Sequence, residues 1–110
     1  MNQPIILRQT KDQSGSRYLQ ATIAANGDVV IEGQDLGKGV EAFWGEGLRE
    51  YEFAMTIQAA DVPTLIKALD SQSNLLLALK QQFSHQSGLE PKAFLDAHQI
   101  PYAFWSRVGD

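Results

Sequence analysis

Carboxylates are the first residues in this chain whose types and spacing could carry chemistry. Six of them lie between residues 32 and 52, namely Glu32, Asp35, Glu41, Glu46, Glu50 and Glu52. Glu50 and Glu52 are two residues apart, so on a strand they would share one face. Such a pair can bind a hard cation or perform acid–base chemistry. Because the sequence offers no third ligand pattern, no EF-hand spacing and no nearby histidine, we favour a solvated strand face and predict no metal site.

A segment that contains two glycines is the second candidate motif. Residues 37–42 read GKGVEA, which matches the G-x-G-x-x-A spelling of a dinucleotide-binding loop. That chemistry requires a strand before the loop, a helix that meets the pyrophosphate and a parallel strand after it. Here the preceding strand is predicted to belong to a hairpin, the following helix to last about one turn, and the nearby carboxylates to repel phosphate. We therefore interpret the segment as a glycine-rich connector and predict no cofactor.

Nucleophilic catalysis has little support in the sequence. The chain has no cysteine, and its two histidines, His85 and His98, each lie near an expected helix end, where a cation suits the helix dipole. Ser84 adjoins His85, but no serine lies in a G-x-S-x-G motif. A serine–histidine–aspartate site stays open as an alternative, because its members need not be neighbours in sequence. The prediction is that the protein has no catalytic residues.

The net charge of −4 is concentrated in one segment. Residues 32–52 carry six acids and two bases, Lys38 and Arg49, and six minus two equals the entire excess. Direct binding of nucleic acid requires a basic surface and is therefore disfavoured. A basic protein partner is favoured, because long-range attraction would steer it toward this segment.

Two aromatic pairs, Phe43–Trp44 and Phe104–Trp105, are candidate interface residues. Aromatic side chains are enriched at protein interfaces and among the residues that dominate binding energy. In an extended segment the two neighbours of a pair would point apart, so the sequence leaves open which rings belong to the core. An exposed Trp44 between Glu41 and Glu46 would act as an anchor within an acidic surface.

The elements that position these residues can be read from hydrophobic periodicity. We expect strands at residues 4–10, 17–24 and 29–32, a polar turn at 11–16, and a hairpin turn at Asn26–Gly27, where both residues tolerate positive φ. Residues 33–47 are expected to form a loop with one helical turn at 39–44. Residues 50–58 alternate again, with their apolar face made by Tyr51, Phe53, Met55 and Ile57.

The period changes to a helical one after residue 60. Asp61 is the expected N-cap of a helix that reaches Leu69, and Ser73 is the expected N-cap of a second helix that reaches Phe83. Glu90–Pro91 is expected to open a third helix, which ends near residue 99. A last strand is expected at residues 102–108. The order β-β-β-β-α-α-α-β predicts one α+β domain over residues 1–110, with an antiparallel sheet of about five strands and three helices packed on one face.

A resemblance adds to this interpretation. The segments DLGKGVEAFWGEGLREYEF, at residues 35–53, and FLDAHQIPYAFWSRVGD, at residues 94–110, resemble parts of small uncharacterised bacterial proteins. In size, acidity and lack of a catalytic motif, the chain is also similar to immunity proteins of bacterial toxin systems, including contact-dependent inhibition. This likeness implies a cytoplasmic protein that binds and neutralises a cognate toxin, expected to be a basic nuclease.

The sequence-based hypothesis is thus an immunity-type binding protein rather than an enzyme. Its partner-binding residues are expected to be Glu32, Asp35, Glu41, Phe43, Trp44, Glu46, Glu50 and Glu52. Cofactors, direct nucleic-acid binding and membrane association are not expected, because no apolar run approaches the roughly 20 residues of a membrane span. The alternative is a small cytoplasmic regulatory or housekeeping protein that binds a different partner.

Overall fold

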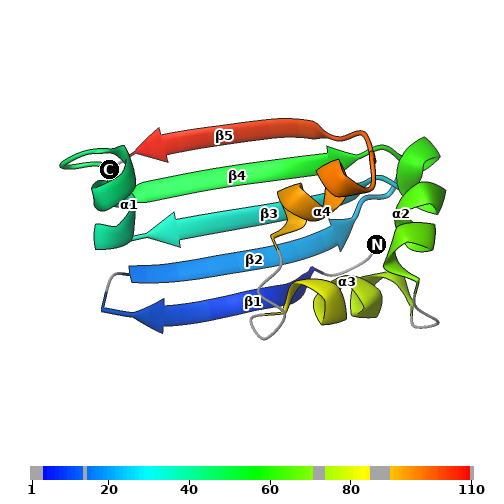
Figure 1. Ribbon diagram of the computed structural model, residues 1–110, viewed down its shortest axis with the longest axis horizontal. Helices are drawn as coiled ribbons and strands as arrows, with labels where there is room; N and C mark the ends of the chain where they lie inside the picture. Colours follow the sequence, from blue (N-terminus) through cyan, green and yellow to red (C-terminus); the bar gives the residue numbers. More distant parts are fainter. Residues whose placement is uncertain (1–3, 14, 71–73, 85–89, 110) are drawn as a thin grey trace.

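A single antiparallel sheet forms the frame of the protein (Figure 1). The computed structural model describes residues 4–13, 15–70, 74–84 and 90–109. Neighbouring strands in the sheet follow each other in sequence, namely β1 (Ile5–Asp12), β2 (Gly15–Ile23), β3 (Val29–Leu36), β4 (Glu50–Ile57) and β5 (Ala103–Gly109). The predicted α+β class with five antiparallel strands is confirmed.

The number and order of the helices differ from the prediction. The described residues contain four α-helices, α1 (Lys38–Trp44), α2 (Val62–Leu69), α3 (Leu75–Phe83) and α4 (Pro91–Ala97), and one 3-10 turn, η1 (Ala59–Asp61). The extra helix, α1, lies between β3 and β4, where a loop with one helical turn was expected. This helix has seven residues, lies between Gly37 and Gly45, and buries only Val40. A helix with one buried side chain leaves no repeating apolar pattern in the sequence, which is why it was not predicted.

Strand β3 is also longer than expected. The prediction ended it at Glu32, because Gly33 and the polar residues after it resemble a loop. In the structure β3 continues to Leu36 and is paired on both sides, with Ser16 of β2 and Glu50 of β4 opposite Leu36. Pairing on both sides outweighs the weak strand preference of these residues.

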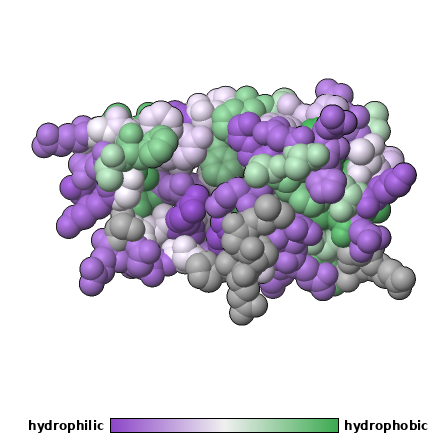
Figure 2. Space-filling view, in the orientation of Figure 1, coloured by the Kyte–Doolittle hydropathy of each residue, from purple (hydrophilic) through white to green (hydrophobic). Residues whose placement is uncertain are grey.

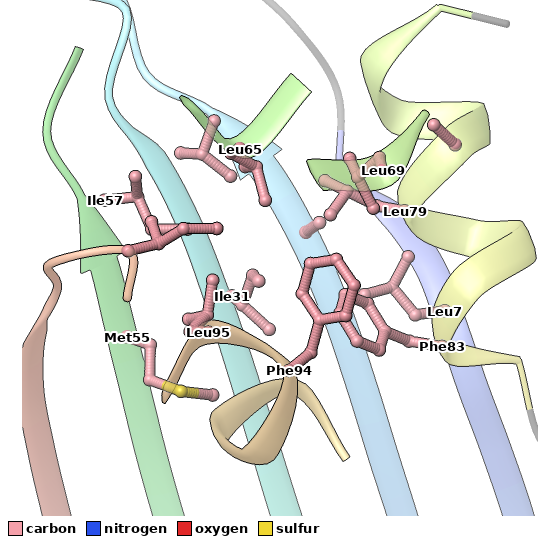
Figure 3. Close-up of a cluster of buried hydrophobic side chains, with 14 of the residues drawn as sticks. Leu7, Ile31, Met55, Ile57, Leu65, Leu69, Leu79, Phe83, Phe94 and Leu95 are labelled. Atoms are coloured by element: carbon pink, nitrogen blue, oxygen red, sulfur yellow. The ribbon is translucent and has the colours of Figure 1, made fainter. Parts of the chain in front are cut away.

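The core lies between one face of the sheet and helices α2, α3 and α4 (Figure 3). Alternate residues of β2, β3 and β4 point toward these helices, and Ala21, Ile31 and Met55 form one buried row across the sheet. The helices contribute fully buried side chains, among them Leu65, Leu79, Phe83 and Leu95. Burying each large apolar side chain contributes roughly 1.5–3 kcal/mol, so this layer holds the helices on the sheet.

The helix starts follow the predicted signals in part. Pro91 opens α4 as expected, whereas Asp61 makes no side-chain cap for α2, which continues directly from η1. The described cap of α3 is Asn74, whose side chain accepts a hydrogen bond from the Leu77 N–H at 3.0 Å. Ser73, the predicted cap, lies outside the described residues. No helix in the described part of the chain is long and apolar enough to cross a bilayer.

The three helices cover only part of the sheet face. They gather toward the end where α2 lies, and α1 stands at the opposite end (Figure 1). Between them, rows of paired residues such as Arg17, Asp35 and Tyr51 face the helix side of the sheet. The helices therefore leave part of this face uncovered, between α1 at one end and the helical layer at the other.

Candidate functional site

Five aromatic rings form a connected strip across this uncovered part of the sheet face. Successive ring centroids are 5.1, 5.4, 5.8 and 6.4 Å apart along the series Phe43, Trp44, Tyr51, Phe53 and Phe104. The first two rings belong to α1, the next two to β4 and the last to β5. We call these five residues the aromatic strip. Contacts at these distances stabilise aromatic pairs beyond simple burial.

Much of the aromatic strip is open to solvent. Phe43 is 79% exposed, and Trp44 and Phe104 are each 45% exposed, while Tyr51 and Phe53 are half-buried. Apolar surface is visible on this face of the molecule between the α1 end and the α2 end (Figure 2). Exposed rings in mutual contact form a continuous apolar surface, which on a protein usually marks a binding site.

Gly33 determines how one ring of the strip lies. It is directly opposite Phe53 in the β3–β4 pairing, and a Cβ atom built on Gly33 would overlap the Phe53 ring. The far edge of the ring therefore lies directly over Gly33, in space that any side chain at this position would fill. This close approach keeps Phe53 in line between Tyr51 and Phe104.

A cavity of about 650 Å³ opens at the α1 end of the strip. Its apolar walls include Phe43, Trp44 and Tyr51, and Arg17 and Asp35 contribute charged groups. The remaining lining residues are Thr10, Asp12, Gly15, Ser16, Leu36, Gly39 and Val40. We call this cavity together with the aromatic strip the aromatic groove. Its volume falls in the range of typical ligand sites.

Four charged side chains form a chain of ion pairs along one side of the groove. Arg17 Nε lies 3.1 Å from Asp35 Oδ1, Arg17 Nη1 lies 3.6 Å from Glu90 Oε1, and Arg8 Nη1 lies 2.9 Å from the same Glu90 atom. Burial lowers the pKa of Arg17, but the hydrogen bond and charge of Asp35 and the charge of Glu90 together raise it. The network ties β1, β2 and β3 to the residue that precedes α4.

Arg8 enters this network because β1 is irregular. The register of the β1–β2 pairing shifts between Ile6 and Arg8, and Leu7 and Arg8 are both buried. Such a bulge turns a side chain toward the opposite face of the strand. A guanidinium that is only 8% exposed requires a charged partner, and Glu90 supplies it.

The structure does not bring the predicted partner-binding residues onto one surface. Asp35, Phe43 and Trp44 line the groove. By the strand pairings, the outward face of the sheet instead carries Glu32, Glu50 and Glu52. The other two, Glu41 and Glu46, lie on α1 and in the turn that follows it.

Ion pairs also reduce the local charge that the sequence suggests. Arg107 Nη2 lies 3.1 Å from Glu50 Oε1 and 3.2 Å from Glu52 Oε1, and Arg17 binds Asp35. Adding these two arginines, which come from outside residues 32–52, changes the local sum from −4 to −2. The acidic surface is therefore weaker in the folded protein than the count of residues indicates.

Glu41 has a structural role at the end of α1. Its Oε2 accepts a hydrogen bond from the Gly47 N–H at 2.9 Å and lies 3.3 Å from Arg49 Nε. The Gly47 hydrogen bond, followed by the contact with Arg49, lowers the pKa of the Glu41 carboxyl. The carboxylate thereby closes the turn between α1 and β4 and fixes the position of α1 at the groove.

Among the residues of the groove, sequence reasoning missed Arg17, Tyr51 and Phe53, and it left open whether the Phe104 ring is core or interface. The alternation of β4 placed Tyr51 and Phe53 on the apolar face, and that face was expected to be core. Arg17 shares the face of Leu19 in β2, and a charged residue at an inward position was a signal that part of this face is open. Neither pattern shows how far the helices extend over the sheet.

The other candidate motifs lie apart from the groove or form connectors. The His98 ring packs against Phe94, with 4.4 Å between centroids, at the end of α4, and His85 lies outside the described residues. Strand β4 is antiparallel to β3, so the GKGVEA segment does not form the parallel unit of a dinucleotide site. In the described ranges no group of three histidine, cysteine, aspartate or glutamate residues could hold a metal ion. Comparison with known protein families, known proteins and solved structures finds no match to this chain.

Proposed function

We propose that this protein is a binding protein that docks a protein partner in the aromatic groove. The observation that carries the proposal is the aromatic strip, five contiguous rings of which three are substantially exposed. Tyrosine, tryptophan and arginine dominate binding energy at protein interfaces, and the groove brings Trp44, Tyr51 and Arg17 together. Fixed aromatic rings also lose little conformational entropy when a partner covers them.

The extent of the strip favours a macromolecular partner over a small ligand. Phe43, Trp44 and Tyr51 line the cavity, but Phe53 and Phe104 lie outside its lining. A molecule that fills 650 Å³ would leave the β4–β5 end of the strip exposed. A protein surface that inserts one side chain into the cavity and lies over the remaining rings would cover the entire strip.

Within this class we propose a neutralising, immunity-type role toward a basic toxin in the cytoplasm. The net charge of −4 supports a basic partner, and in the cavity lining the two acids Asp12 and Asp35 outnumber the one base, Arg17. Because much of the acidic segment is internally paired, charge would set the association rate while the aromatic strip supplies most of the affinity. A small regulatory protein with a different partner would use the same groove.

Two tryptophans provide a matched test. Trp44 is 45% exposed in the groove, and Trp105 is 53% exposed on β5, where its pairing with Ala54 places it on the opposite face of the sheet. A tryptophan buries up to about 250 Å², so complete burial of Trp44 would remove roughly 70–110 Å² from water. At about 25 cal/mol per Å², Trp44→Ala should weaken binding by about 2–3 kcal/mol, roughly 30- to 150-fold in Kd.

The experiment begins with capture of the partner from the native host by the immobilised wild-type protein. Binding of the captured partner to the wild type, Trp44→Ala and Trp105→Ala is then measured kinetically at two salt concentrations. We expect Trp44→Ala to act mainly through faster dissociation and Trp105→Ala to leave dissociation of the partner unchanged. Equal effects of the two substitutions would show that the aromatic groove is not the binding site.

A further inference from the structure

Strand β5 presents an open edge of the sheet. It pairs with β4 on one side, and no element in the described part of the chain lies beyond its other side (Figure 1). Five of its seven residues are exposed, and Phe104 and Trp105 are among them. An edge strand carries unpaired N–H and C=O groups that can pair with another strand.

The two edges of the sheet differ in how they are protected. Strand β1 has the bulge between Ile6 and Arg8, carries Lys11 and Asp12, and lies against α3. Bulges, charges and covering elements are the usual devices that prevent edge pairing. Strand β5 pairs with β4 in an unbroken register and contains neither proline nor lysine. Its outer edge is thus the one that can accept a further strand.

We infer that β5 pairs with β5 of a second copy of this chain, antiparallel and about a two-fold axis at Ser106. Ser106 is the middle residue of the strand Ala103–Gly109, so this register gives every residue of the strand a partner. Trp105 then faces Arg107 of the partner subunit, and Phe104 faces Val108 of the partner subunit. The first pairing joins a cation to an aromatic ring, and the second joins two apolar side chains.

The neighbouring registers are less favourable. Centring the axis on Arg107 would place two guanidinium groups directly opposite each other, which destabilises strand pairing. Centring it on Trp105 would leave Val108 and Gly109 without partners. A register shifted by one residue would place Ser106 opposite Trp105 or Arg107 of the partner subunit. It would put the helical layers of the two copies on opposite sides of the sheet and would misalign the apolar residues.

The resulting dimer would contain one ten-stranded sheet with both helical layers on the same side. Its contacts are self-complementary, as a two-fold interface requires. The inference does not depend on the proposed function, because the residues at its centre, Trp105, Ser106 and Arg107, belong neither to the cavity lining nor to the aromatic strip. Of the strip, only Phe104 lies on β5.

Cysteine substitution tests both the dimer and its register. The chain has no cysteine, so a single introduced thiol can only join two copies. Directly opposed residues in an antiparallel pair have Cα atoms about 4.5–5.5 Å apart, which suits a disulfide. Ser106→Cys should therefore form a covalent dimer under mild oxidation. Ala103→Cys is the matched control, because its two copies would lie roughly 20 Å apart, and it should stay uncrosslinked.

Charge reversal provides the second measurement, by sedimentation or native mass spectrometry. Ser106→Asp and Ser106→Lys should each weaken dimerisation by roughly tenfold or more, because like charges would meet on the axis. An equimolar mixture of the two variants should form a mixed dimer with restored affinity. A wild-type chain that stays monomeric at all concentrations, or equal crosslinking of Ser106→Cys and Ala103→Cys, would overturn the inference and leave the edge to a strand from another protein.

Discussion

The close contact between Gly33 and Phe53 yields a prediction that needs only the isolated protein. Because a Cβ atom on Gly33 would overlap the Phe53 ring, Gly33→Ala must displace this ring from the backbone of β3. Phe53 is half-buried, so its ring can move toward solvent without unfolding the sheet. The displacement would break the aromatic strip between Tyr51 and Phe104.

The expected free-energy change is the difference between two effects. The displaced ring loses its contacts with Tyr51 at 5.8 Å and Phe104 at 6.4 Å. At about 0.5–1.5 kcal/mol for each aromatic pair, this loss is about 1–3 kcal/mol. Against it, alanine in a strand interior is more favourable than glycine by roughly 0.5–1 kcal/mol. Gly33→Ala should therefore lower the free energy of unfolding by up to about 2.5 kcal/mol.

A double-mutant cycle tests this explanation, because the effect of Gly33→Ala on the free energy of unfolding should change sign when the Phe53 ring is absent. Once Phe53→Ala has removed the ring, Gly33→Ala has nothing to displace and should stabilise the protein by roughly 0.5–1 kcal/mol. Urea denaturation of the wild type, both single variants and the double variant gives the coupling energy, expected at about 1–3 kcal/mol. If Gly33→Ala had the same effect in both backgrounds, the close contact would not determine the position of Phe53.

Two further predictions concern the core and the turn after α1. Leu79 is fully buried, so Leu79→Ala should lower the free energy of unfolding, measured by denaturation, by about 2–5 kcal/mol. Leu77 lies on the same helix and is 44% exposed, so Leu77→Ala should change it by less than about 0.5 kcal/mol. Since the pKa of Glu41 is lowered in the folded protein, its stabilisation is complete above the ordinary value of about 4.3 and is lost as pH falls through the lower folded value. The Gly47 amide resonance should titrate below 4.3, and Glu41→Gln should abolish that titration.

The sequence alone determined the elements that have strong periodicity. Period-two alternation predicted β2 and β4, the Asn26–Gly27 pair predicted the hairpin, and apolar stripes predicted the helices after residue 60. These patterns succeed because each records which side of its own element is buried. The extension of β3 and helix α1 were not predicted, because residues 33–47 are stabilised by strand pairing and by contacts with distant parts of the chain.

The tertiary structure alone decided which candidate residues share a surface. Residues 32–52 appeared to be one acidic segment, but the alternation of β3 and β4 sends Asp35 to the helix side and Glu52 to the outward face. Their charges meet arginines that are distant in sequence, 18 residues away for Asp35 and 55 for Glu52. No local pattern specifies such pairings, because they follow from strand order and register.

Exposure of the aromatic rings was likewise decided by tertiary packing. The sequence predicts that Tyr51 and Phe53 lie on the apolar face of β4, and they do. Whether that face is core or surface depends on how much of it the helices cover, and α2, α3 and α4 together leave the α1 end of the sheet uncovered. The same apolar face is therefore core at one end and the aromatic groove at the other.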